Sequence, residues 1–196
     1  MEHSFQIKMP KVETFNREEI LEKVVQLFHK KGYSATSMQD LVDATGLNRS
    51  SIYNSFGSKM EIYQEGLKAY KQSANKMIQR LLIHTDHPLK VIRNLFTTSE
   101  EQKANGCLLS NCATEMANQD EAIRNFLIHN REHMQELFEE LVQKGQSDGT
   151  INTNKTAKEY AIYLFSALQG LRITGMILNE QEQIESIADT TLSVLA

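Results

Sequence analysis

The side chains best suited to chemistry lie close together between residues 48 and 59, and that chemistry is hydrogen bonding to nucleic acid. Arg49 can bind the two acceptors that guanine presents in the major groove of DNA. Ser50 and Ser51 follow it, and Tyr53 offers an aromatic ring and a hydroxyl group. Lys59 comes shortly after and can pair with a phosphate. A short helix that exposes this segment would present its first turn to the edges of bases.

Two short helices joined by a tight turn would position these residues. Ser37 is a typical helix cap with Asp40 three residues later, which predicts a helix over residues 38–45. Gly46 permits the turn, because a left-handed backbone costs little only at glycine. Asn48 can cap a second helix over residues 49–54. This pattern predicts a helix-turn-helix, whose second helix enters the major groove.

The chain before and after this pair completes a three-helix unit. Asn16, with Glu19 three residues later, predicts a capping box at the start of a helix that ends at Gly32. Ser58 and Glu61 predict another box, which opens a long helix to about residue 82. The residues expected to contact DNA are Thr36, Ser37, Gln39, Asn48, Arg49, Ser50, Ser51, Tyr53, Asn54, Ser55 and Lys59.

Residues 16–63 resemble the N-terminal domain of TetR-family transcriptional regulators. The matching segments are GY at 32–33, ATSMQDL at 35–41, ATGL at 44–47, SIY at 51–53 and FGSKME at 56–61. The resemblance implies a homodimer that binds palindromic double-stranded operator DNA and acts as a repressor. It also implies that a small-molecule effector binds the C-terminal domain and releases the DNA. The chain departs from the family at Ser55, where members commonly carry histidine, and at Val42, where many carry alanine.

The remainder of the chain predicts an all-α body. The two prolines and the long 3.6-residue apolar periodicities favour helices over strands. Further helices are expected at about 88–102, 106–117 and 120–145. Another is expected from a cap at Thr153 or Asn154 to about residue 178, and a last one over 180–194. We therefore expect a helix-turn-helix DNA-binding domain over residues 1–62 and a helical ligand-binding and dimerisation domain over residues 63–196.

The charge distribution is compatible with a DNA-binding end on an acidic body. The net charge is −4, but residues 1–60 carry eight Lys or Arg against seven Asp or Glu. The rest carries thirteen against eighteen, so the excess of acid lies outside the first 60 residues. A small basic face of this kind would bind DNA with strong salt dependence.

The body is expected to supply both a partner interface and a ligand pocket. The last two helices are the most apolar, and a helix apolar around much of its circumference must be buried on more than one side. The residues expected at the dimer interface are Leu164, Leu168, Leu171, Ile184, Ile187, Thr191 and Leu195. Those expected around the ligand are Phe96, Cys107, Met116, Phe126, Tyr163, Phe165 and Met176.

Cys107 leaves a second hypothesis open. It lies in the first turn of a predicted helix, where the helix dipole stabilises a thiolate, so it could sense oxidants or electrophiles. The alternative is that Cys107 is a small buried hydrophobic residue. A third possibility is a DNA-binding factor without an inducer, which a solid core would favour over a cavity of several hundred Å³.

Other functional classes find little support in the sequence. His129 and His133 fit an H-x-x-E-H pattern, but His133 falls at the margin of the apolar stripe of their helix and His129 points away from it, so we expect no metal. Phosphate-binding glycine loops and nucleophile elbows are missing, and we expect neither an enzyme nor a cofactor. The sequence has no apolar run of about 18 residues and no apolar N-terminal segment, which predicts a cytoplasmic location without a membrane partner.

Overall fold

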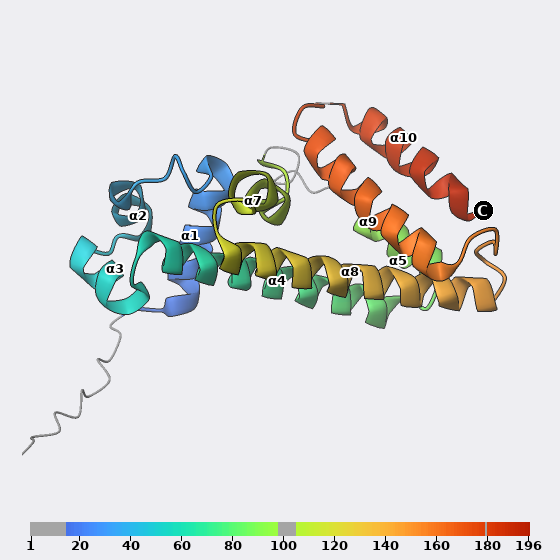
Figure 1. The fold of residues 1–196 in the computed structure, drawn as a ribbon, viewed down its shortest axis with the longest axis horizontal. Helices are drawn as coiled ribbons and strands as arrows, with labels where there is room; N and C mark the ends of the chain where they lie inside the picture. The colour runs from blue at the N-terminus through green and yellow to red at the C-terminus, as the bar shows by residue number, and fades with distance from the viewer. Residues whose placement is uncertain (1–14, 98–104, 179) are drawn as a thin grey trace, which may run out of the picture.

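A computed structural model describes residues 15–97, 105–178 and 180–196, and the regular structure in these ranges is entirely helical (Figure 1). The predicted all-α fold is therefore confirmed for the described residues. Figure 1 shows α1, α2 and α3 gathered at one end of the molecule, with α4 and α8 running along its length. The helices α9 and α10 lie together above the other end.

The N-terminal helices form where their caps predict. Helix α1 spans Arg17–Lys31, α2 spans Met38–Thr45, α3 spans Arg49–Phe56 and α4 spans Lys59–His84. Complete capping boxes open α2 and α4, which confirms both predictions. Asn16 caps α1 through the backbone amides of residues 18 and 19, but its own amide group, rather than its backbone, reaches the Glu19 carboxylate. The predicted capping box there is incomplete.

The body contains α5 (Pro88–Leu95), α7 (Leu108–Met116), α8 (Glu121–Ser147), α9 (Ala157–Thr174) and α10 (Gln181–Leu192), with a final 3₁₀ turn. The end of the helix predicted over 88–102 lies partly outside the described residues. None of the helices in the described ranges is long and apolar enough to cross a membrane.

Two helix boundaries differ from the sequence prediction for physical reasons. Helix α8 continues through Gly145 to Ser147, and Gly145 makes room for the Ile151 side chain instead of ending the helix. A Cβ at Gly145 would lie only 2.5 Å from the Ile151 side chain. Helix α9 begins later than predicted, since Thr156 rather than Thr153 or Asn154 forms the capping box, together with Glu159.

The buried side chains form two clusters, and the first crosses the boundary expected after residue 62. It joins α1 to α4 with residues of α7 and α8, among them Leu108, Cys112, Met116 and Ile123. The second cluster holds α5, α8, α9 and α10 together. Helix α7 is therefore part of the core that supports the helix-turn-helix.

Candidate nucleic-acid interface and internal cavity

Helix α3 has one buried face and one exposed face. Ile52 and Phe56 are almost completely buried and anchor the helix. Arg49, Ser50, Tyr53 and Asn54 lie on the exposed side, and the Tyr53 side chain is 47% exposed. The Arg49 guanidinium carbon lies 5.9 Å from the centre of the Tyr53 ring. The exposed face of this short helix therefore offers several hydrogen-bond donors and one aromatic ring.

Arg17 fixes the end of α3 against α4. Its guanidinium donates to the Ser55 carbonyl oxygen at 3.2 Å and to the Glu65 carboxylate at 2.7 Å. The guanidinium carbon also lies 4.2 Å from the centre of the Phe56 ring. Contacts from α1 and α4 thus set the orientation of α3. The side chains on its exposed face are not needed to hold the helix in place.

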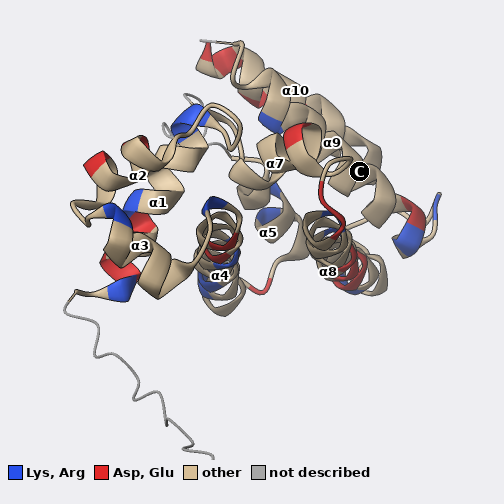
Figure 2. Cartoon of the chain, turned by 60° about the vertical axis from the view of Figure 1, so that its left-hand side comes forward, with Lys and Arg blue, Asp and Glu red and all other residues tan. Residues whose placement is uncertain are grey.

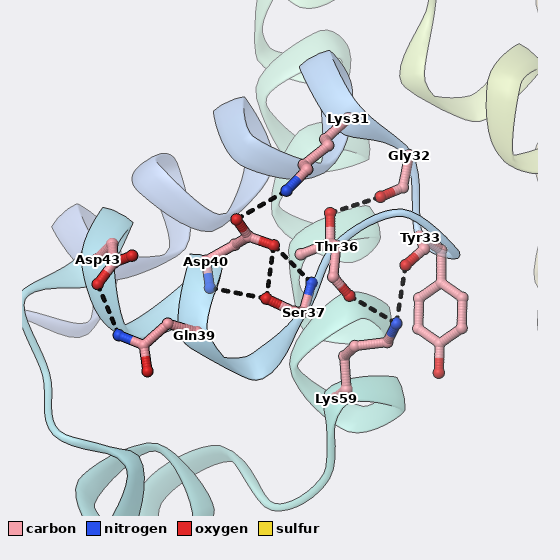
Figure 3. A network of polar contacts seen from close by, with 9 residues as sticks. All are labelled: Lys31, Gly32, Tyr33, Thr36, Ser37, Gln39, Asp40, Asp43 and Lys59. Atoms are coloured by element: carbon pink, nitrogen blue, oxygen red, sulfur yellow. Dashed lines mark hydrogen bonds and ion pairs between the residues drawn. The ribbon is translucent and has the colours of Figure 1, made fainter.

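Lys59 closes the other side of the unit (Figure 3). Its ammonium donates to the carbonyl oxygens of Tyr33 at 2.9 Å and Thr36 at 2.7 Å. Because an ammonium carries three donors, one N–H remains for a phosphate. Thr36 is only 1% exposed, and its hydroxyl donates to the Gly32 carbonyl oxygen at 2.6 Å. The prediction that the Thr36 side chain contacts DNA is therefore wrong, because this side chain is buried and its hydroxyl is hydrogen-bonded within the loop.

The start of α2 is held by a second polar network, also drawn in Figure 3. The Asp40 carboxylate pairs with the Lys31 ammonium at 2.7 Å and accepts hydrogen bonds from the Ser37 backbone and hydroxyl. The hydrogen bond from Lys31 contributes most, followed by those from Ser37, and together they hold the pKa of the Asp40 carboxyl well below its usual range. Gln39 donates to Asp43 at 2.8 Å. Ser37 and Gln39 remain exposed, so both can still reach a DNA backbone.

The charges of this unit are mixed rather than gathered into one basic face. Figure 2 shows Lys and Arg interspersed with Asp and Glu over α1, α2 and α3. Arg49 is the one charged residue in the sequence of α3. On α3, the expected small basic face therefore reduces to Arg49.

The C-terminal part of the chain is hydrogen-bonded to the loop before α2 through Glu115 of α7. Its carboxylate accepts hydrogen bonds from the backbone amides of Tyr33 at 2.9 Å and Ser34 at 2.6 Å. Burial opposes ionisation of Glu115, but these two bonds and the nearby Lys59 outweigh it and lower its pKa. A second link joins α1 to the start of α7, where His29 Nε2 donates to the Gly106 carbonyl oxygen at 3.0 Å.

A cavity of about 100 Å³ lies between α4, α7, α8 and α9. Its apolar wall includes Ile78, Leu95, Leu109, Met134, Phe165 and Leu168. Tyr70 and Cys107 also line it, and the Tyr70 hydroxyl donates to the Cys107 sulfur at 3.8 Å. A second hollow of about 350 Å³ adjoins it and shares Leu109, Asn130, Phe165 and Gln169 with it. Together they reach the size of a small-molecule site.

The structure brings only two of the seven expected pocket residues to this cavity, Cys107 and Phe165. Phe96 and Met116 are buried in the two separate cores. Phe126 packs beside the first core under the Lys71 ammonium. Tyr163 is 41% exposed and Met176 lies against Gly106. These five were chosen for size and apolarity, which do not distinguish a cavity wall from a filled core.

Cys107 is the N-cap residue of α7 rather than a residue of its first turn. Its side chain makes no capping hydrogen bond, and it is partly exposed. Cys112, by contrast, is completely buried. Of the two thiols, only Cys107 lines the cavity.

Most residues expected at a dimer interface belong instead to the core of the chain. Leu164, Leu168, Leu171, Ile184 and Leu195 are all at least nine-tenths buried. Only Ile187 and Thr191 keep partial exposure. The sequence prediction took the densest apolar stripe for a partner surface, but α8 and α10 already occupy that stripe. The exposed face of α9 includes Ile162, Tyr163, Ser166, Gly170 and Ile173, and the exposed Ile177 follows just after the end of the helix.

The His129 and His133 pair shows no sign of a metal site. His129 Nδ1 hydrogen-bonds to the carbonyl oxygen of Asn125, one turn earlier in α8, at 2.7 Å. Within residues 15–97, 105–178 and 180–196, no three His, Cys, Asp or Glu side chains are grouped so that they could hold a metal ion.

The residues that sequence reasoning missed are those whose partners are remote in the chain. Arg17 and Glu65 are separated by 48 positions, and Glu115 and Tyr33 by 82. No local spacing reports such pairs. Arg172 lines the cavity and donates to the Leu95 carbonyl oxygen at 3.1 Å, and burial lowers its pKa. In the sequence, Arg172 could be noticed only as a charged residue within a strongly apolar segment.

Family models match both parts of the chain. Residues 20–65 match the model described as bacterial regulatory proteins of the tetR family, and residues 89–191 match the tetracyclin repressor-like C-terminal domain. Three curated relatives align over most of their length: YezE of Bacillus subtilis, DhaR of a Mycobacterium species and ComR of Escherichia coli. YezE, an HTH-type transcriptional regulator, is 22% identical over 90% of this chain and 94% of its own. DhaR and ComR, both named HTH-type transcriptional repressors, are 24% and 28% identical and cover 91% and 93% of this chain, or 91% and 89% of their own.

Solved structures share the fold over nearly the whole chain. A cysteine mutant of the regulator CifR, complexed with 26-base-pair operator DNA, has a TM-score of 0.80 and 23% identity. The alignment covers 95% of this chain and all of that one. The reduced form of Escherichia coli NemR has a TM-score of 0.78 and 17% identity, over 92% of this chain and 97% of its own. At these identities the likeness establishes the fold.

Proposed function

The chain belongs to the TetR family of bacterial regulatory proteins, and from this premise we propose that it is a transcriptional repressor that binds a palindromic operator as a homodimer. The observation that carries this proposal is the exposed face of α3, where Arg49 and Tyr53 project beyond a turn made by Gly46. Two relatives, DhaR and ComR, are named as repressors. A repressor of this kind acts on the bacterial chromosome, which places it in the cytoplasm.

The proposed contacts divide into reading and anchoring groups. Arg49, Ser50 and Tyr53 lie on the exposed face and can meet base edges and the adjacent backbone. Ser37 and Gln39, at the start of α2, and Lys59, at the start of α4, can contact phosphates. Asn48, Ser51, Asn54 and Ser55 complete the set: Asn48 accepts from the Ser51 amide, and Asn54 donates to Ser50.

Selection of DNA from a random pool by the purified protein tests the proposal. We expect an enriched palindrome whose half-sites are spaced by about 34 Å, one turn of the duplex, or by a multiple of it. Binding of the selected site should be measured by fluorescence anisotropy at several salt concentrations. Failure to enrich any palindrome would contradict the proposal.

The partner surface that we propose is the outer face of α9 together with α10. Ile162, Tyr163, Ile173 and Ile177 are each at least 40% exposed, which is unusual for large apolar side chains. Gly170 lies in the middle of this face, where a glycine weakens a helix by about 1 kcal/mol. A Cβ at Gly170 would meet nothing within 4 Å in its own chain. A glycine at this position would allow a partner helix to approach closely.

The cavity between α4, α7, α8 and α9 is the proposed effector site, and α7 is the proposed link to the DNA-binding unit. Cys107 borders the cavity at one end of α7, and Glu115 holds the Tyr33–Ser34 backbone near the other. A ligand that displaces α7 therefore shifts the loop on which α2 depends. By linkage, operator DNA must weaken effector binding by the same factor as the effector weakens DNA binding.

Reaction at Cys107 is a second candidate for the same regulation, favoured by the position of this thiol in the cavity wall. Its thiolate would add to the β-carbon of an enone, while the α-carbon takes a proton from water. Cys112 is the matched internal control because it is completely buried. Mass spectrometry after brief exposure to an enone should find adducts on Cys107 alone, and equal labelling of both cysteines would reject this route.

A further inference from the structure

The cavity differs in charge from the acidic chain around it. Lys71 and Arg172 line the inner part, and Arg124 and Arg131 line the adjoining outer hollow. Among the described residues, neither part is lined by Asp or Glu, although the chain has 25 acids against 21 bases. A cleft lined by one sign of charge with apolar walls concentrates its field on whatever enters it.

The two inner cations come from two different helices. Lys71 belongs to α4, and its ammonium lies 5.6 Å from the centre of the Phe126 ring, so its position is supported by a cation–π contact. Arg172 belongs to α9, and its hydrogen bond to the Leu95 carbonyl oxygen holds the guanidinium at the wall. In the outer hollow, Arg131 forms an exposed 3.4 Å ion pair with the adjacent Glu132.

The neutral polar groups also favour a ligand that accepts hydrogen bonds. The Gln169 side-chain oxygen already accepts a short bond from the Ser110 hydroxyl, which leaves the Gln169 amino group as a donor. Asn130 lines both parts of the cleft and can donate as well. The remaining wall is aliphatic and aromatic, with Leu95, Met134 and Phe165 among its members.

We propose that the cleft binds a small organic anion, a carboxylate with a short aliphatic body, whose charged end meets Lys71 and Arg172. This inference rests on the proposed effector role of the cavity and assigns its ligand class. An inner volume of about 100 Å³ is too small for a large aromatic ligand. Since the outer hollow of about 350 Å³ shares four residues with it, a linear chain can extend from one into the other.

Three probes of equal length but different charge test the proposal: hexanoate, hexanamide and hexylamine. Binding is measured by isothermal calorimetry on the full protein without DNA. We expect hexanoate to bind about tenfold more tightly than the amide, since a hydrogen-bonded charge is worth about one decade in affinity. Hexylamine should bind less tightly still. A preference for hexylamine or hexanamide, or no hexanoate binding up to about 10 mM, would overturn the proposal.

Variants of two lysines on α4 locate the site. Lys71→Gln should weaken hexanoate binding about tenfold and leave hexanamide binding unchanged. Lys68→Gln is the matched control, because Lys68 is exposed on the same helix and lies outside the cavity. Lys71→Arg keeps the charge and should keep the preference for hexanoate. Equal effects of Lys71→Gln and Lys68→Gln would reject the assigned contact.

Release of operator DNA is measured separately, by anisotropy with the same three probes. If hexanoate binds the protein but leaves the DNA complex intact, the effector role fails while the anion site stands. If hexylamine instead binds and releases DNA, the effector role stands and the anion assignment fails.

Discussion

Removal of the Glu115 carboxylate tests how the body holds the DNA-binding unit. In Glu115→Ala the backbone amides of Tyr33 and Ser34 lose a charged acceptor at 2.9 and 2.6 Å. A hydrogen bond to a charged group contributes about 1.5–3 kcal/mol, but Ser34 is exposed and water can replace its partner. We therefore expect the free energy of unfolding to fall by about 2 kcal/mol. For a chain of this length, that lowers the melting temperature by about 4 to 8 °C.

The pH dependence of this loss has a definite sign. The pKa of Glu115 is lowered in the folded protein, so its carboxylate stabilises the fold at pH values above the ordinary glutamate value of 4.5. This contribution disappears as the pH falls through the lowered pKa. The melting temperatures of Glu115→Ala and the parent should therefore differ at pH 7 and converge under acid conditions.

Thermal unfolding followed by circular dichroism is the assay, and Glu136→Ala is the control. Glu136 is exposed on α8 and makes no ion pair within the described part of the chain. Exposed substitutions of this kind change stability by no more than about 0.5 kcal/mol. If Glu115→Ala melts within about 1 °C of Glu136→Ala at pH 7, the carboxylate is not a clamp and the proposed coupling through α7 is refuted.

Three further substitutions test other parts of the account. Gly170→Leu places a large side chain on the outer face of α9 and should convert the proposed dimer into a monomer, measured by light scattering; a dimer that persists would place the interface elsewhere. Gly46→Ala should cost about 1 kcal/mol in urea unfolding, because the backbone φ is +73° and no neighbouring atom opposes the added methyl group. A neutral effect would mean that the turn tolerates a side chain. Lys59→Met removes two hydrogen bonds to loop carbonyl oxygens and should cost about 2 kcal/mol. A cost below about 0.5 kcal/mol would show that water replaces the ammonium there.

The local elements could be predicted from the sequence because their signals act over three or four residues. Ser37 with Asp40 and Ser58 with Glu61 both form the expected capping boxes, and Asn48 caps α3. These interactions depend only on spacing along the chain. The helix-turn-helix and its exposed face followed from them.

The residues that connect the elements could not be predicted in this way. Arg17 reaches Ser55 and Glu65, and Glu115 reaches Tyr33, across distances in sequence that only the packed fold brings together. Five of the seven residues predicted at the dimer interface are buried in the chain itself, for a related reason. An apolar stripe on α9 predicts that this face is buried, but not whether the same chain or a partner buries it. In the structure, α8 of the same chain covers it.

The central claim is that α3 reads DNA with the residues that begin at Arg49. Its most direct test is the affinity of Arg49→Ala/Tyr53→Ala for the selected operator, measured by anisotropy beside the parent, with circular dichroism to verify that the variant is folded. Both side chains point away from the core, so we expect a folded variant whose specific binding is at least tenfold weaker. A folded variant that binds the operator as tightly as the parent would contradict the account.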